Sequence, residues 1–105
     1  MIVIRRLSIL LALVLAGSCG RDLTVTDYST TCTVDADCTP VFVGDPCTGC
    51  SCSNASINVS SRAKYDADAA AQARLCSPLR PQCLADCVQP VVVCLAGRCA
   101  LKAPQ

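Results

Sequence analysis

The amino-acid sequence predicts a small disulfide-rich α+β domain, and three observations lead to this fold class. The chain has 105 residues, of which eleven are cysteines and only three are aromatic. A domain of this size buries little apolar surface, so it usually requires disulfides, a metal or a partner to stay folded. An Ala-rich stretch and a Val-rich run with an Ala-Gly turn then supply the helix and the strands.

The N-terminus carries the features of an export signal. Arg5 and Arg6 precede an apolar run over residues 7–16. This run has about 10 residues, whereas a membrane-spanning helix needs about 20. Residues 1–18 are therefore predicted to be a signal peptide, which directs the rest of the chain to an oxidising compartment.

The segment Ala16-Gly17-Ser18-Cys19 resembles the lipobox of bacterial lipoproteins, in which small residues precede a cysteine that becomes the new N-terminus. The usual Leu is displaced by one place, to Leu15. The resemblance implies a diacylglycerol and an acyl group on Cys19, and hence the membrane as a partner. The alternative is ordinary secretory cleavage, with Cys19 as one more disulfide partner. Parity favours lipidation, because an odd number of cysteines leaves one without a disulfide partner.

The lipobox resemblance also bears on location. Gly20 follows the lipidated position, whereas Asp at that place in similar lipoproteins often means retention at the inner membrane. The resemblance therefore implies the outer membrane, on its periplasmic or surface face. The chain as a whole is similar to uncharacterised cysteine-rich bacterial lipoproteins. Residues 19–31 are hydroxyl-rich and are predicted to be the lipidated N-terminus and a flexible tether, and residues 32–105 to be the disulfide-rich domain.

All cysteines after Cys19 are expected to form disulfides. They are Cys32, Cys38, Cys47, Cys50, Cys52, Cys76, Cys83, Cys87, Cys94 and Cys99. Cys47 and Cys50 also have the spacing of a redox CxxC motif, and clustered thiolates can hold zinc or copper(I). Structural bridges are favoured because no helix begins directly after Cys50, the chain has no His, and thiols oxidise outside the cytoplasm. No metal or other cofactor is expected.

Two Asp residues lie between the first two cysteines of the predicted domain. The spacing of Cys32 and Cys38 resembles the first cysteine pair of whey-acidic-protein-type inhibitor domains, although the adjacent Cys-Cys pair of that family is missing. Asp35 and Asp37 are expected to accept hydrogen bonds from nearby backbone N–H groups in a turn. Calcium binding is the alternative, but no glycine bend or later carboxylate completes a calcium loop.

The segment 59–75 is predicted to be a helix. It is rich in Ala, the strongest helix former, and Asn58 or Ser60 is placed to cap its N-terminus. Several residues, most of them alanines, recur at about helical spacing and are expected to face the disulfide-bonded part of the domain, which small side chains can approach closely. They are Val59, Ala63, Ala67, Ala70, Ala71 and Arg74.

A short second helix is predicted over residues 81–88, because a proline favours the first position of a helix. On that helix Cys83 and Cys87 face the same way. Cys50 and Cys52 also face the same way if their segment is extended. This arrangement resembles the cystine-stabilised helix and strand of defensin-type scaffolds, in reversed order along the chain. The resemblance suggests that Cys50 and Cys52 pair with Cys83 and Cys87.

The remaining elements are predicted to be short strands. A β-branched run at 39–44 contains a proline and is expected at a sheet edge. Residues 91–102 are predicted to form a hairpin around Ala96-Gly97. A two-residue turn places Cys94 opposite Cys99, whereas a three-residue turn with a bulge places them on opposite faces. We prefer the bulge, because alanine is unfavourable at the positive φ that the tight turn requires.

Composition limits the function. The chain has no His, which removes His-based catalytic triads, and its net charge of +1 gives little attraction for nucleic acid. We therefore expect a membrane-anchored binding or structural module that presents disulfide-fixed loops to a protein or glycan, and not an enzyme. The alternative is a small protease inhibitor whose loop 77–82 presents Arg80 to a trypsin-like pocket.

Overall fold

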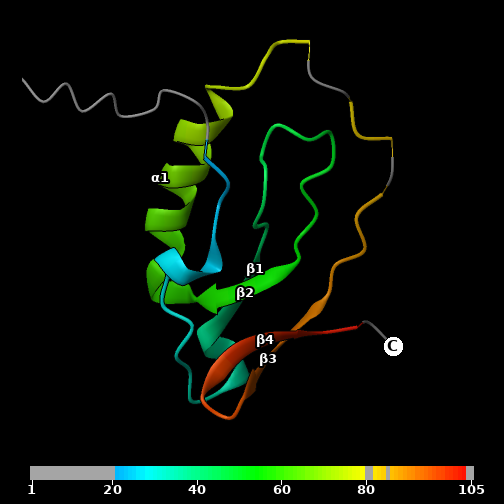
Figure 1. Cartoon of the computed structure of the whole chain (residues 1–105). Helices are drawn as coiled ribbons and strands as arrows, with labels where there is room; N and C mark the ends of the chain where they lie inside the picture. The colour runs from blue at the N-terminus through cyan, green and yellow to red at the C-terminus, as the bar shows by residue number, and fades with distance from the viewer. Residues whose placement is uncertain (1–20, 80–81, 85, 104–105) are drawn as a thin grey trace, which may run out of the picture.

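The computed structural model describes residues 21–79, 82–84 and 86–103, and Figure 1 shows how their elements are arranged. The predicted signal peptide lies outside these residues. The elements in chain order are the short 3-10 helices η1 (Val25–Asp27) and η2 (Asp35–Asp37), strands β1 (Cys38–Val41) and β2 (Ala55–Asn58), η3 (Val59–Ser61), α1 (Arg62–Ala73), and strands β3 (Val91–Leu95) and β4 (Arg98–Lys102). The predicted small disulfide-rich α+β fold with short strands and a C-terminal hairpin is confirmed.

Strands β1 and β2 form a two-stranded antiparallel sheet, with Cys38 opposite Asn58 and Val41 opposite Ala55. Pro40 fits within β1 because both strands of a two-stranded sheet are edge strands, where a missing N–H is tolerated. The β-branched run predicted at 39–44 thus forms a strand only as far as Val41.

The apolar core is small and lies between this sheet, α1 and the segment that precedes Cys32. Its buried members are Leu23, Tyr28, Val41, Ile57 and Tyr65. The side chain of Ile57 is 0% exposed, and the rings of Tyr28 and Tyr65 meet edge to face with their centroids 5.5 Å apart. Such aromatic pairs contribute more than the area that they bury.

The predicted helix is present. Helix α1 continues from η3, so the two together cover most of the range 59–75. The Asn58 side chain accepts a hydrogen bond of 2.8 Å from the backbone N–H of Ser60. This bond satisfies a donor that would otherwise have no partner at the start of the helix.

The prediction of which helix face packs against the core is wrong. Tyr65 is the buried residue of α1, and Ala69 packs partly against the core, whereas Ala63, Ala67 and Ala70 are exposed. The physical reason is area: one tyrosine ring removes much more apolar surface from water than several methyl groups. A single large side chain therefore sets the orientation of an alanine-rich helix.

The segment expected to be a flexible tether forms part of the folded domain over its described residues, 21–31. Leu23 is 5% exposed and forms two backbone hydrogen bonds of 2.8 Å with Gly44. Tyr28, seven per cent exposed, lies against Tyr65 in the core. The folded part therefore begins before Cys32, because two large apolar side chains dock even though they form no repeating pattern.

The second helix predicted over 81–88 is not present in the described residues of that range, 82–84 and 86–88. Their apolar side chains have nothing to pack against, since Leu84 is 92% and Val88 is 70% exposed. A helix of two turns is unstable in water without a packed face. The helical spacing of Cys83 and Cys87 is therefore not enough to form a helix without a packed face.

Strands β3 and β4 form the predicted hairpin, but the preference for a three-residue turn is wrong. The loop has two residues, with Ala96 at φ 50° and Gly97 at φ 78°. Cys94 consequently lies directly opposite Cys99. An L-residue in this region costs about 1–2 kcal/mol, and the disulfides described below require both cysteines on one face. These cross-links outweigh the local cost at Ala96.

Candidate functional site

Five disulfides use all ten of the cysteines that follow Cys19. They fall into two groups with different surroundings. The first group joins the segment around η2 to the C-terminal hairpin, and the second joins two loops whose described residues form no helix or strand. Cys19 itself lies outside the described residues.

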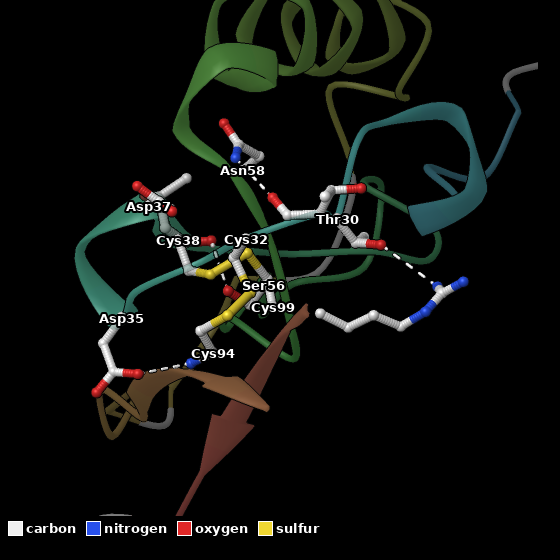
Figure 2. Close-up of a disulfide and its surroundings, with 12 residues drawn as sticks. Thr30, Cys32, Asp35, Asp37, Cys38, Ser56, Asn58, Cys94 and Cys99 are labelled. Atoms are coloured by element: carbon white, nitrogen blue, oxygen red, sulfur yellow. Dashed lines mark hydrogen bonds between the residues drawn. A yellow bond between two sulfur atoms is a disulfide. The ribbon is translucent and has the colours of Figure 1, made fainter. Parts of the chain in front are cut away.

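The first group consists of Cys32–Cys94 and Cys38–Cys99, which lie next to each other in Figure 2. Cys32 and Cys38 are each 6% exposed. Backbone hydrogen bonds continue the connection, since Cys32 N–H donates to Gly97 O at 3.0 Å. The hairpin is therefore attached to the core by two covalent bonds and by backbone pairing.

The prediction that a carboxylate organises the turn between these cysteines is confirmed for Asp37, whereas Asp35 bonds to the distant strand β3. Asp37 Oδ2 accepts hydrogen bonds from the backbone N–H of Thr33 at 2.8 Å and of Val34 at 3.2 Å. Asp35 Oδ1 accepts one of 2.7 Å from Cys94 N–H, across to β3 (Figure 2). The bonds from Thr33 and Val34 lower the pKa of Asp37. Both carboxylates thus hold structure around the first disulfide group.

The sulfur atoms of Cys32, Cys38 and Cys99 lie within 4.8 Å of one another. That spacing is compatible with a shared metal, but thiolates are the ligands that zinc and copper(I) require. Each of these sulfurs is bonded to another sulfur. In the oxidised protein this cluster is therefore a pair of adjacent disulfides.

The second group consists of Cys47–Cys76, Cys50–Cys83 and Cys52–Cys87. The pairing proposed for Cys50 and Cys52 is thus present, even though the helix that suggested it is absent from the described residues. Partners follow the same order along both segments, so the bridges form a parallel ladder. Cys47 and Cys50 are not bonded to each other, which argues against a redox CxxC disulfide.

We call the two loops joined by this ladder the stapled region, residues 45–53 and the described part of 76–89. None of its described residues belongs to a helix or a strand. Leu79 is 90% exposed and Leu84 is 92% exposed. A hollow of about 390 Å³ lies between the loops. It is lined by Pro46, Thr48, Gly49, Ser51, Pro78, Gln82 and Cys83. The ladder fixes backbone and apolar side chains in positions where a partner can reach them.

Arg80, the predicted inhibitory residue of the loop 77–82, lies outside the described residues. Its neighbours Ser77, Pro78 and Leu79 are exposed. The cysteines on either side of them, Cys76 and Cys83, are both bridged to the other loop.

A second, polar hollow of about 270 Å³ lies beside α1. Lys64 Nζ is 3.0 Å from Asp68 Oδ2, and the Tyr28 hydroxyl donates to the same oxygen at 2.8 Å. The bonds from Lys64 and Tyr28 lower the pKa of Asp68, while burial, followed by the bond to Asp68, raises that of Tyr28. The phenol therefore stays protonated at neutral pH, and these groups stabilise one another. The backbone N–H of Arg21 closes one side of the hollow by donating to Gln72 Oε1 at 2.7 Å.

The sequence interpretation missed the contributions of Leu23, Tyr28 and Tyr65 to the core. The available signal was composition, because a chain with two tyrosines, one phenylalanine and no tryptophan has few large side chains to bury. Tyr65 also bonds to the backbone, since its hydroxyl donates to Phe42 O at 2.6 Å and accepts from Phe42 N–H at 3.1 Å. It thereby holds the chain beyond β1 to the helix.

The chain was compared with protein-family models, curated proteins and solved structures, and nothing matches it. Among the described residues, no helix has the length and apolar character needed to cross a bilayer.

Proposed function

We propose that this chain is an extracytoplasmic lipoprotein, attached to the membrane through Cys19, whose stapled region binds a protein or glycan partner. The observation that carries the proposal is the pairing of cysteines. Ten of the eleven are used in five bridges, and the eleventh stands at position 19, directly after an apolar run and small residues. Five bridges require an oxidising compartment, and a lipid accounts for the remaining thiol.

The anchor proposed on Cys19 is a permanent one. One acyl chain gives only marginal membrane binding, whereas several chains hold a protein on the bilayer. Gly20 in place of Asp favours the outer membrane in this proposal. Leu84 of the stapled region is 92% exposed and supplies an apolar contact of the kind that binding surfaces use.

The test is to change Cys19→Ser in the full chain and to follow the protein after cell fractionation. We expect the wild-type protein in the membrane fraction, with an intact mass that includes diacylglycerol and an acyl group, and the variant in the soluble extracytoplasmic fraction. Ser18→Ala is the matched control and keeps the membrane association, because Ala is also small. Membrane association that survives Cys19→Ser, or a wild-type mass without lipid, would reject the anchor.

A second candidate, protease inhibition, is favoured by one observation: the exposed residues 77–79 belong to a loop whose two ends, Cys76 and Cys83, are both bridged. A loop fixed in this way loses little entropy on binding. The test is inhibition of trypsin by the purified protein, which Arg80→Ala should abolish and Lys102→Ala should leave unchanged. Binding of a partner with no effect of Arg80→Ala favours the first candidate.

A further inference from the structure

We propose that the end of the molecule at which α1 terminates lies against the bilayer, with Leu75 and Leu79 at the membrane interface. The proposal rests on the lipid anchor proposed for Cys19. It adds the orientation of the domain and the surface that meets the lipid. The opposite end, which carries the turn between β3 and β4, then faces away from the membrane.

The first step is the length of chain between the anchor and the fold. Cys19 precedes Arg21 by two residues, and two extended residues reach about 7 Å. Arg21 N–H donates to Gln72 Oε1 at 2.7 Å, in the last turn of α1. Leu23 is buried and is held by its two backbone bonds to Gly44. The segment between Cys19 and Arg21 is therefore too short to let the lipid move far from the C-terminal half of α1.

The second step is the apolar surface at that end. Leu75 is 54% exposed and Leu79 is 90% exposed, and both belong to the segment that leaves α1. In Figure 1 this segment (yellow) lies at the end of the molecule where α1 terminates, and the first described residues (blue) run beside the helix. Because Leu75 and Leu79 lie near the lipid proposed on Cys19, their side chains can contact the acyl layer of the membrane.

The third step is charge. Arg21 and Arg74 are exposed at the same end, and Arg21 lines the polar hollow together with Lys64 and with the carboxylates of Asp22, Asp27 and Asp68. Arginine donates hydrogen bonds to phosphate oxygens in a fixed geometry, and its aliphatic stem can lie along apolar surface. Arginines beside leucines are the combination expected at the boundary between headgroups and acyl chains.

The hairpin provides the internal comparison. Leu95 is 61% exposed, so it is as available to lipid as Leu75 on exposure alone. It lies next to the β3–β4 turn, which Figure 1 places at the opposite end of the molecule from the end of α1. Arg98, opposite Leu95 in the hairpin, is exposed as Arg74 is, so the position of the anchor is what distinguishes the two ends, and this makes the proposal testable.

The experiment uses the absence of tryptophan from the chain. Full-length lipidated Leu79→Trp and Leu95→Trp proteins are inserted into vesicles of phosphatidylethanolamine and phosphatidylglycerol in which part of the lipid carries brominated acyl chains. Bromine quenches tryptophan fluorescence only at short range. We expect quenching of the Leu79→Trp protein to exceed that of the Leu95→Trp protein by at least about twofold, with emission shifted to shorter wavelength, because only the first lies at the interface. Equal quenching in the two proteins, or stronger quenching at position 95, overturns the orientation.

The same preparation separates the two proposals. Flotation with the vesicles and an intact mass that includes lipid report on the anchor alone. If both are observed and quenching is equal, the orientation fails and the anchor stands. If the protein carries no lipid and does not float, both proposals fail. A third variant, Leu75→Trp, is expected to follow the Leu79→Trp protein, and quenching of Leu75→Trp no greater than that of Leu95→Trp also counts against the orientation.

Discussion

The two halves of this small domain are held together by different means. The packed region, which comprises residues 23–28, β1, β2, η3 and α1, has a core around Ile57 and a pair of tyrosines. The stapled region has three disulfides, no helix or strand among its described residues, and leucines that are almost fully exposed. The packed region therefore folds around buried apolar side chains, with one bridge from Cys38 to the hairpin, whereas the stapled region is shaped by its three disulfides.

The comparison shows what the disulfides allow. Disulfides fix the backbone of a loop without requiring that its apolar side chains be buried, so the loop can present those side chains on the surface. With three cross-links the stapled region keeps Leu79 and Leu84 exposed on the surface of the protein. The residues that stabilise the fold thus lie in the packed region, whereas the exposed apolar residues available to other molecules lie in the stapled region.

The largest effect is expected from Ile57→Ala in the packed region. Ile57 is 0% exposed, so truncation removes buried methylenes and leaves a cavity, which costs about 4 kcal/mol of unfolding free energy. Leu84→Ala is the matched control in the stapled region and is expected to change stability by less than about 0.5 kcal/mol. Urea unfolding followed by tyrosine fluorescence measures both. Similar losses in the two variants would mean that the stapled region has a core of its own.

The next effect compares one bridge from each group. Replacing Cys38 and Cys99 with Ala opens a ring of about 13 residues that is closed at its other end by Cys32–Cys94, and the expected cost is about 3 kcal/mol. Replacing Cys52 and Cys87 should change the unfolding seen by the tyrosines by less than about 1 kcal/mol, because this bridge holds a region that can open locally.

Limited proteolysis completes that comparison. Loss of Cys52–Cys87 is expected to expose the chain between Leu84 and Val88 to cleavage, while the packed region stays intact. Loss of Cys38–Cys99 should not change cleavage there. Equal shifts of the tyrosine-monitored transition in the two variants contradict the division into two regions.

The smallest effect expected is on acid stability. Hydrogen bonds, first from the backbone of Thr33, lower the pKa of Asp37 in the folded protein. Its stabilising contribution is therefore fully present above the pKa of unfolded aspartate, about 3.9, and is lost as the pH falls through the lower folded value. Asp37→Asn should flatten the decline of stability below about pH 4, and Asp86→Asn in the stapled region is the control for loss of one charge. An unchanged acid decline in Asp37→Asn contradicts the role of this carboxylate. Disulfides do not titrate, so the stapled region keeps its cross-links in acid.

Local signals in the sequence predicted much of this fold. The alanine content of 59–75, the capping position of Asn58 and the location of the hairpin around Ala96-Gly97 all depend on short-range interactions, which propensity describes. The resemblance to cystine-stabilised scaffolds also suggested the pairing of Cys50 and Cys52 with Cys83 and Cys87, although the helix of those scaffolds is absent from the described residues.

The remaining features depend on contacts between distant segments. Docking of Leu23 and Tyr28 cannot be seen in a segment without a repeating pattern, and Tyr65 orients α1 because of its size. The tight turn at Ala96 is set by bridges to residues about 60 positions away. The sequence also placed Cys19 and Arg80 as functional residues, and both lie outside the described part of the chain.

The parallel order of the bridges in the ladder affects how the protein becomes oxidised after export. Joining Cys47 to Cys76 requires a loop of about 30 residues to close, but it then brings Cys50 and Cys83 into a ring of about a dozen. Cys52 and Cys87 follow in a ring that is smaller still. A disulfide catalyst therefore has to join one distant pair correctly, Cys47 and Cys76. The thiols of the other two pairs are then close enough in the chain to favour the native bridges.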